Sequence, residues 1–218
     1  MDKGKWKRLT SRTEFSVLCA LVVLIVIMSV ASPYFLKTAN IFNVLSQISR
    51  YGIISVGMAL VMITGGIDLS VGYVVGLSAT MGAFMITNLG IPWPLVFILV
   101  ILMGALIGAV NGFFITVVNL PAFIVTLAMS KILSGCILLL TKGMPISFDT
   151  PLAYLGSGYI GVVPVCVIIM FICIIVGTIF AERTQTGRNI YAAGNNERAA
   201  SLSGIKIRKT KTLVYIIC

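Results

Sequence analysis

Long apolar runs alternate with short polar segments along most of this chain. Each run is close to 20 residues, the length that crosses about 30 Å of hydrocarbon as an α-helix. The runs predict six complete membrane spans, at residues 15–32, 43–63, 71–88, 94–118, 122–140 and 161–180. The short alternating segments of a membrane β-barrel are absent from the sequence. The expected fold is therefore all-α, a polytopic bundle of membrane helices.

The two ends of this pattern need separate interpretation. A seventh apolar run, "TLVYIIC", reaches Cys218 after seven residues, which are too few to cross a bilayer. It predicts the start of a seventh span in a longer, truncated protein. The first run follows a basic leader, as a signal peptide would, but no small-residue cleavage site precedes "PYFLK" and further spans follow. We interpret it as an uncleaved first helix.

Basic residues are concentrated in two segments that flank the apolar runs. Residues 1–14 hold five Lys or Arg, residues 181–211 hold seven, and residues 141–160 hold one. Six spans separate the two basic segments, so the positive-inside rule predicts that both are cytoplasmic. The chain then divides into a leader, 1–14, and a transmembrane domain, 15–218, with a cytoplasmic loop at 181–211. Topology accounts for the net charge of +10, and no nucleic-acid partner is expected.

Composition excludes most catalytic chemistry. The sequence has no histidine and therefore no imidazole base, histidine-ligated metal or Ser-His triad. It also lacks the GxxxxGK[ST] loop that binds ATP phosphates. The cysteines show no metal-binding spacing and are interpreted as small buried hydrophobes; they are Cys19, Cys136, Cys166, Cys173 and Cys218. No enzyme activity, metal site or cofactor of its own is predicted.

The stretch "TGGIDLSVG" places an isolated carboxylate between two apolar runs. Gly65 and Gly66 are suited to ending one helix, because glycine readily adopts the left-handed conformation. Asp68 or Ser70 could then accept hydrogen bonds from the free amides of the next helix, at the positive end of its dipole. Discontinuous membrane helices often border transport sites. The pattern favours a capping turn over direct contact with a solute, and both remain open.

A second polar constellation lies in the basic loop. The segment "NNERAASLSG" predicts a short helix that Asn195 or Asn196 caps and Gly204 ends. Its small apolar face is expected to comprise Ala199, Ala200 and Leu202, with charged residues on both sides. We interpret it as a docking surface for a protein partner, in preference to a merely solvated loop.

Small residues and two intramembrane charges complete the pattern. Gly104, Gly108 and Gly112 recur every four residues, as do Gly72 and Gly76, so each set lines one helix face and predicts close helix packing. Arg50 and Lys131 fall inside or near apolar runs. Each either faces a cavity or partner or extends its charge toward water along its stem.

Three motifs resemble the ribose-type sugar permeases of bacterial binding-protein-dependent ABC importers, within the branched-chain amino acid and sugar permease family. They are "GMALVMITGGIDLSVGYVVGLSA", "GALIGAVNGFFITVVNLPAFIVTLAMSKILSG" and "TQTGRNIYAAGNNERAASLSGI". The similarity covers nearly the whole chain in the family's order and spacing, and "GGIDLSVG" favours the sugar subgroup.

The resemblance implies a permease subunit in the bacterial inner membrane with a cytoplasmic N-terminus. Its expected partners are a second permease copy in a homo- or heterodimer, an ATP-binding subunit that holds ATP and Mg²⁺, a periplasmic or lipid-anchored sugar-binding protein, and membrane lipid. The loop 143–160 would face the binding protein. The coupling helix that contacts the ATPase would lie in 194–204, with these residues implicated: Gly194, Asn195, Asn196, Glu197, Ala199, Ala200, Ser203 and Gly204.

A neutral, polyhydroxylated sugar needs weak hydrogen-bonding groups along its path. Ser70, Asn111 and Thr126 are suitable types, beside the helix break at Gly65, Gly66 and Asp68. Asp68 is interpreted as architecture that shapes the pathway. The alternative is an ion-coupled secondary transporter in which Asp68 binds a proton or sodium ion.

Overall fold

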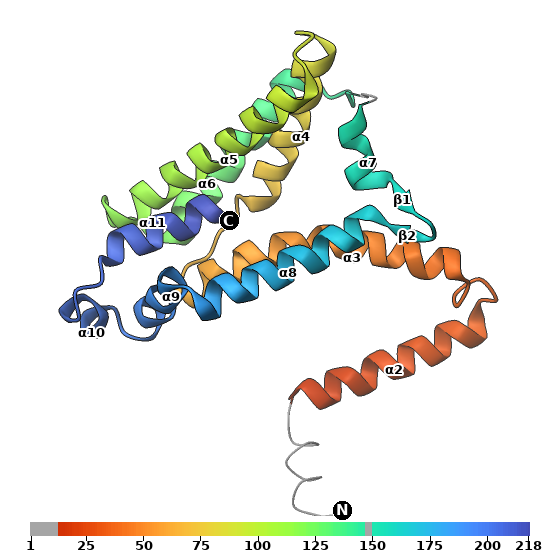
Figure 1. Ribbon diagram of the computed structural model, residues 1–218, viewed down its shortest axis with the longest axis horizontal. Helices are drawn as coiled ribbons and strands as arrows, with labels where there is room; N and C mark the ends of the chain where they lie inside the picture. The colour runs from red at the N-terminus through yellow and green to blue at the C-terminus, as the bar shows by residue number, and fades with distance from the viewer. Residues whose placement is uncertain (1–12, 147–149) are drawn as a thin grey trace, which may run out of the picture. The chain divides into compact units, whose positions relative to one another are not determined.

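The computed structural model describes residues 13–146 and 150–218 (Figure 1). Most of the predicted leader, residues 1–12, therefore lies outside the described residues. The chain divides into two compact units, 1–47 and 48–218, and each is described by itself. The described part of the first unit holds α2 (Thr13–Ala31) and the beginning of α3 (Thr38–Ile63). From Phe15 to Ala31 most side chains of α2 are apolar and exposed, as expected of a helix that lipid surrounds.

The second unit contains the rest of α3 and the remaining elements. Its helices are α4 (Val71–Thr87), α5 (Trp93–Thr116), α6 (Ala122–Thr141), α7 (Pro151–Ser157), α8 (Val165–Arg183), α9 (Gln185–Asn195), α10 (Glu197–Leu202) and α11 (Ile207–Ile217). Two short antiparallel strands, β1 (Tyr159–Ile160) and β2 (Val163–Pro164), pair Tyr159 with Pro164. Within the described ranges the architecture is otherwise helical, in agreement with the predicted all-α class.

A helix occupies each of the six predicted spans. By length and composition, α3, α5, α6 and α8 are long and apolar enough to cross a membrane. The apolar parts of the other two helices, Phe15–Ala31 and Val71–Thr87, are shorter. At 1.5 Å per residue such a 17-residue helix measures about 26 Å, near the lower limit for crossing a bilayer.

Three helix starts differ from the prediction by four or more residues. Helix α3 begins at Thr38, five residues before the predicted start at 43. The helix expected from residue 161 begins at Val165, because the β1–β2 hairpin turns at Gly161 with φ +63° and Pro164 precedes the helix. Helix α11, expected as the start of a seventh span at "TLVYIIC", begins earlier, at Ile207. Three basic residues assigned to the loop 181–211 therefore lie in this helix. Helix α9 was not predicted at all, although Ile190 and Ala193 form a buried, helically spaced pair on it.

The glycine-lined face of α5 is a packing surface, as predicted. Helix α11 lies against it (Figure 1). A Cβ at Gly108 would overlap the Tyr215 carbonyl, and one at Gly112 would lie 2.9 Å from Thr212 Cα. Gly104 is less crowded, with Val74 at 3.8 Å. On α4 the prediction holds at Gly76, where a Cβ would be 3.2 Å from Ile137 of α6, but a Cβ at Gly72 would meet open space.

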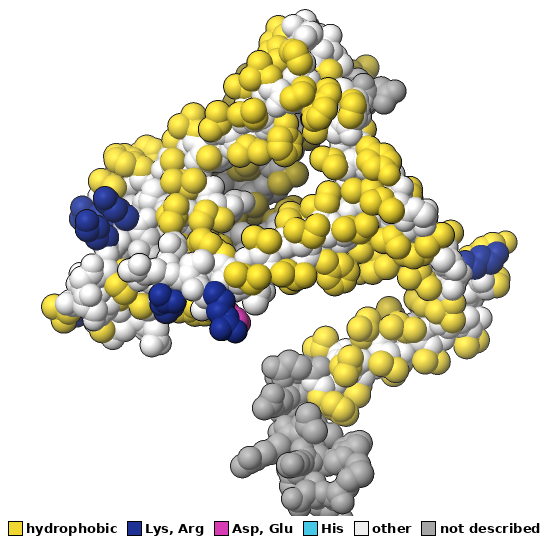
Figure 2. All heavy atoms as spheres, viewed as in Figure 1, with side chains coloured by type: hydrophobic (Ala, Val, Ile, Leu, Met, Phe, Trp, Pro, Cys, Tyr) yellow, Lys and Arg dark blue, Asp and Glu magenta, His cyan; other side chains and the backbone are white. Residues whose placement is uncertain are grey.

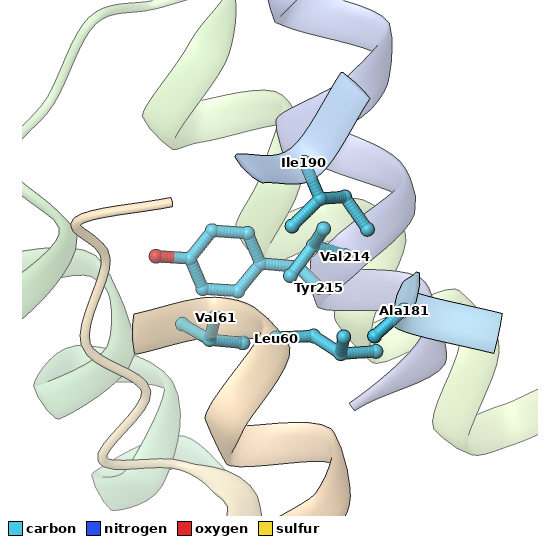
Figure 3. Close-up of a cluster of buried hydrophobic side chains, with 6 residues drawn as sticks. All are labelled: Leu60, Val61, Ala181, Ile190, Val214 and Tyr215. Carbon is cyan, nitrogen blue, oxygen red and sulfur yellow. The ribbon is translucent and has the colours of Figure 1, made fainter. Parts of the chain in front are cut away.

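A small hydrophobic cluster joins four helices at the far end of α3. Leu60 and Val61 come from α3, and the other members are Ala181 from α8, Ile190 from α9, and Val214 and Tyr215 from α11. Figure 3 shows the Tyr215 ring over Val61. The cluster places the end of α3 beside α9 and α11, and the candidate functional site begins there.

The surface follows the division between spans and loop. Hydrophobic side chains cover the visible faces of α3, α5 and α8, whereas Lys and Arg gather near α9, α10 and the start of α11 (Figure 2). Arg50 on α3 and Lys131 at the middle of α6 are both exposed. Neither forms an ion pair with a residue that the structure describes. An ion pair within the described residues therefore does not account for the position of either charge in an apolar helix.

Candidate functional site

The segment 64–70 interrupts the helical chain between α3 and α4. Helix α3 ends at Ile63, and Gly65 follows in the left-handed conformation with φ +74°. The amides of Gly65 and Gly66 donate to the Met62 and Val61 carbonyls, at 2.9 and 3.1 Å. The chain then runs without helical structure until Val71. The predicted break is confirmed, and Gly65 supplies the conformation that a side chain rarely adopts.

Asp68 is the centre of a buried hydrogen-bonded chain. Its Oδ1 accepts from the Ser70 amide at 2.8 Å and from the Ser70 hydroxyl at 2.6 Å. The Asn111 Nδ2 of α5 in turn donates to the Ser70 Oγ at 2.9 Å. Asp68 is 5% exposed, Ser70 is 0% and Asn111 is 1%. Three residues of the predicted pathway set therefore form one hydrogen-bonded cluster, which ties the break to α5.

The Ile67 carbonyl is a second anchor point of the break. The Thr126 hydroxyl of α6 and the Tyr215 hydroxyl of α11 both lie 3.5 Å from it, in position to donate. The single Thr126 hydroxyl proton is directed mainly to the nearer acceptor, the Ala122 carbonyl of its own helix at 2.8 Å, so its contact with Ile67 is the weaker one. A Cβ at Gly66 would lie 2.5 Å from the Tyr215 hydroxyl, so the ring packs directly on the glycine. Helices α5, α6 and α11 thus all contact one short segment.

One detail of the predicted cap is wrong. Ser70 precedes α4 but its side chain caps no amide of that helix. Its only hydroxyl proton goes to Asp68, and its oxygen accepts from Asn111, so the group is already engaged. Asp68 bonds to the Ser70 amide, one residue before α4. The carboxylate therefore organises the approach to α4 and does not cap its first turn.

The cluster of Asp68, Ser70 and Asn111 fixes the backbone of the break against α5, and one of its acceptor atoms has no hydrogen-bond partner. Among the described residues, the buried side-chain atoms without a hydrogen-bond partner are Asn111 Oδ1 and Thr150 Oγ1. No group of three or more metal-binding side chains lies together in the ranges 13–146 and 150–218. The arrangement offers weak, neutral hydrogen-bonding groups around one carboxylate.

The predicted short helix of the basic loop is α10. Asn196 caps it, with its Oδ1 accepting from the Ala199 amide at 3.0 Å, whereas Asn195 belongs to α9. Ser203 follows the helix, and its hydroxyl donates to the Ala199 carbonyl at 3.0 Å. Gly204 then takes φ +85° and reverses the chain. Both ends of the helix are therefore as the sequence predicted.

The face expected on α10 is not a single face. Ala200 is buried at 5% exposure, whereas Ala199 is exposed and Leu202 is 87% exposed. At 100° per residue, Ala200 points well away from Leu202, so the helix packs one side inward and presents the other. Glu197, at its first turn, is ion-paired with Lys211 of α11.

Gly194 has an intramolecular explanation. A Cβ at this position would overlap the Ile63 carbonyl at the end of α3, so glycine permits the close approach of α9 to the helix break. This close approach is sufficient to explain why glycine occupies position 194, and its predicted role at an ATPase-facing surface stays a prediction. The break and the loop, 130 residues apart in sequence, are in contact here.

Comparison with known proteins adds the family. A family model described as the branched-chain amino acid transport system / permease component matches residues 40–218. That stretch includes the helix break, the glycine face of α5 and helix α10. The chain belongs to this permease family. It is accordingly an all-α, polytopic membrane protein, as its six apolar helices indicate.

Several curated relatives of the permease are named for sugar transport. It is 38% identical over 203 residues to ribose import permease protein RbsC of Haemophilus influenzae, covering 91% of this chain and 62% of that protein. It is 40% identical over 210 residues to RbsC of Escherichia coli K12, with coverage of 94% and 65%. It is 31% identical over 214 residues to galactofuranose transporter permease protein YtfT of the same strain, with coverage of 94% and 62%.

The permease spans somewhat less than two thirds of the length of these relatives. No solved structure matches it. The residue that sequence reasoning missed is Tyr215, which packs on Gly66 and reaches Ile67 from 148 positions further along the chain. A tyrosine hydroxyl in the apolar run "TLVYIIC" was the available signal, because such a group usually finds a partner when buried.

Proposed function

We propose that this chain is the membrane-spanning permease subunit of an ATP-driven importer that translocates a monosaccharide. The observation that carries the proposal is the family match over residues 40–218, together with relatives named for ribose import. A pentose or hexose is neutral and polyhydroxylated. The side chains of Ser70, Asn111 and Thr126 are neutral groups of the type that such a solute requires, and the break must rearrange to expose them because each is at most 1% exposed.

Energy is supplied by a partner in this proposal. The sequence has no nucleotide-binding loop, so ATP and Mg²⁺ bind to a separate ATP-binding subunit. Helix α10 contacts that subunit through its exposed side. Support comes from the well-capped helix and from Leu202, whose side chain is 87% exposed in a segment with few other apolar groups.

The opposite loop receives the sugar-binding protein, which is periplasmic or anchored to lipid. Between α6 and α8 the described residues expose Tyr154, Tyr159, Ile160 and Val162, each at 50% or more. An apolar patch outside the spans is typical of a protein-binding surface. Asp149 and its neighbours in the predicted loop 143–160 lie outside the described residues. A second permease copy completes the pathway, and the N-terminus is cytoplasmic.

Asp68 has a structural role in this mechanism. The two hydrogen bonds that its side chain accepts both come from Ser70 of the same break, which favours a structural role over transport of an ion. Substrate moves when the break region rearranges between outward and inward states, while the partner hydrolyses ATP. The ion-coupled alternative has no supporting observation among the relatives.

Reconstituted transport tests the proposal. The full-length permease is placed in liposomes with its ATP-binding subunit inside and its sugar-binding protein outside, and labelled ribose is measured. The expected result is accumulation that requires ATP and the binding protein and survives a protonophore and a sodium ionophore. Uptake that persists without ATP and collapses with an ionophore would establish the secondary-transporter alternative instead. Labelled galactose in parallel reports the selectivity of the binding protein.

A further inference from the structure

A cationic cleft lies where α5 ends, between α10 and the start of α11. Its volume is about 620 Å³, within the range of small-ligand sites. The charged side chains that line it are Arg198 of α10 and Arg208 and Lys211 of α11, with Glu197 as the counter-charge. Thr116 and Asn119, from the end of α5 and the loop that follows, form the opposite wall.

The charges of the cleft are not balanced internally. Glu197 is committed to Lys211. Among the residues that the structure describes, neither the Arg198 nor the Arg208 guanidinium has a hydrogen bond or an ion pair. Two planar groups that favour bidentate contacts to phosphate or carboxylate therefore share one concave site without an anion.

The cleft adjoins exposed apolar surface. Helix α5 is an apolar span that ends at Thr116, which lines the cleft. Just before and after that residue, Phe113, Phe114, Val117 and Val118 are 41–49% exposed. A ligand held by the two arginines would thus have a polar site for its head and an apolar helix end beside it for its tail.

We propose that this cleft binds the headgroup of an anionic phospholipid, with the phosphate at Arg198 and Arg208 and the acyl chains along the end of α5. Basic pockets beside membrane helices are known to bind such headgroups. The site does not depend on which sugar is transported or on how transport is driven. Bound lipid would add a bridge between α10 and the start of α11, beside the existing packing of α11 on α5 and the Glu197–Lys211 pair.

Lipid binding by the purified chain tests the proposal. The protein is prepared in a zwitterionic detergent, and native mass spectrometry measures its adducts with phosphatidylglycerol and phosphatidylcholine over a concentration series. Phosphatidylglycerol is expected to bind more tightly. The double variant Arg198→Gln/Arg208→Gln should weaken its apparent affinity by roughly 30-fold, which is about 2 kcal/mol at 1.4 kcal/mol per factor of ten.

The matched control removes the same charge nearby. Lys206 and Lys209 line a neighbouring cleft with α9, and Lys206→Gln/Lys209→Gln should leave phosphatidylglycerol binding within about threefold of wild type. Arg198→Lys/Arg208→Lys keeps the charge and should retain most of the preference. Circular dichroism of each variant verifies that the helices remain formed.

Four results would overturn the proposal. The two lipids could bind equally, or the control could lose as much affinity as the arginine variant. Inorganic phosphate at millimolar concentration could displace the lipid completely, which would indicate a site for free anions. Finally, the arginine variant could keep its lipid preference while failing to co-purify with the ATP-binding subunit, which would make the cleft a protein surface.

Discussion

Two polar regions interrupt this otherwise apolar chain, and they are organised in opposite ways. In the helix break at 64–70, Asp68 and Ser70 are buried and hydrogen-bonded to each other. In the loop that carries α10, the caps are local, Leu202 is 87% exposed, and the Glu197 carboxylate is 56% exposed. The polar side chains of the break are hydrogen-bonded within the chain, whereas the exposed surface of the loop is accessible to partner proteins.

The difference indicates which polar groups hold the permease together. A buried hydrogen-bonded group is costly to disturb because its partner loses solvation as well as a bond. An exposed group loses little, because water replaces the contact. The two regions nevertheless meet, since Gly194 of α9 approaches the Ile63 carbonyl and Tyr215 of α11 packs on Gly66. Movement of the loop therefore has a direct mechanical route to the break.

The largest expected effect comes from separating α11 from α5. Gly108→Ala places a Cβ against the Tyr215 carbonyl, so backbone must move and Tyr215 withdraws from the break. Overpacking of this kind costs about 3 kcal/mol or more. We expect a marked loss of thermal stability in detergent, measured by scanning fluorimetry. Gly104→Ala is the control, because its Cβ would meet Val74 at an ordinary 3.8 Å. Equal tolerance of both variants would show that α11 does not pack there.

The next effect concerns the Asp68 carboxylate. Asp68→Ala leaves the Ser70 amide and hydroxyl buried without an acceptor, at about 1–3 kcal/mol for each group. Asp68→Asn retains an acceptor oxygen and should cost about 1 kcal/mol, with sugar uptake preserved. Stability in denaturant and ATP-dependent uptake are measured for both. An asparagine variant that is stable but inactive would show that the charge itself is required, against the architectural role.

These two regions also differ in how far the sequence predicted them. The break and both ends of α10 were predictable, because glycine conformation and asparagine capping are local properties of Gly65, Asn196 and Gly204. The grouping of Asp68, Ser70 and Asn111 was suggested only as a set of suitable side chains. Their order in a hydrogen-bonded chain depends on α5 crossing the break, which no local pattern specifies.

Small residues were the hardest to interpret, for one physical reason. Ala200 was placed on the docking face because it is small and apolar, yet it packs inward. Gly194 was assigned to a partner surface, which stays a prediction, and the approach of α3 gives this glycine an intramolecular role as well. In both cases a tertiary contact contributes to the role of a small residue, and small residues carry little information about which neighbour they face.

A smaller effect is expected from the exposed side of α10. Leu202→Asp should leave stability almost unchanged, because the side chain is 87% exposed. If α10 contacts the ATP-binding subunit, loss of a buried leucine there should weaken association by roughly 10- to 100-fold, or about 1.5–3 kcal/mol. Co-purification and microscale thermophoresis measure it. Leu155→Asp on α7 is the control and should bind the ATPase normally. Unchanged association of the Leu202 variant would remove α10 from the interface.

The smallest effect should come from the ion pair between α10 and α11. Glu197→Gln breaks the pair with Lys211, and a partly exposed pair contributes less than about 1 kcal/mol. A double-mutant cycle with Lys211→Met, by chemical denaturation in detergent, should give a coupling energy of about 0.5 kcal/mol that falls as salt rises. A salt-insensitive coupling above about 2 kcal/mol would mean that the loop is locked internally like the break. In that event, α10 would move with α11 as one body, and the contrast between a self-contained break and an open loop would not hold.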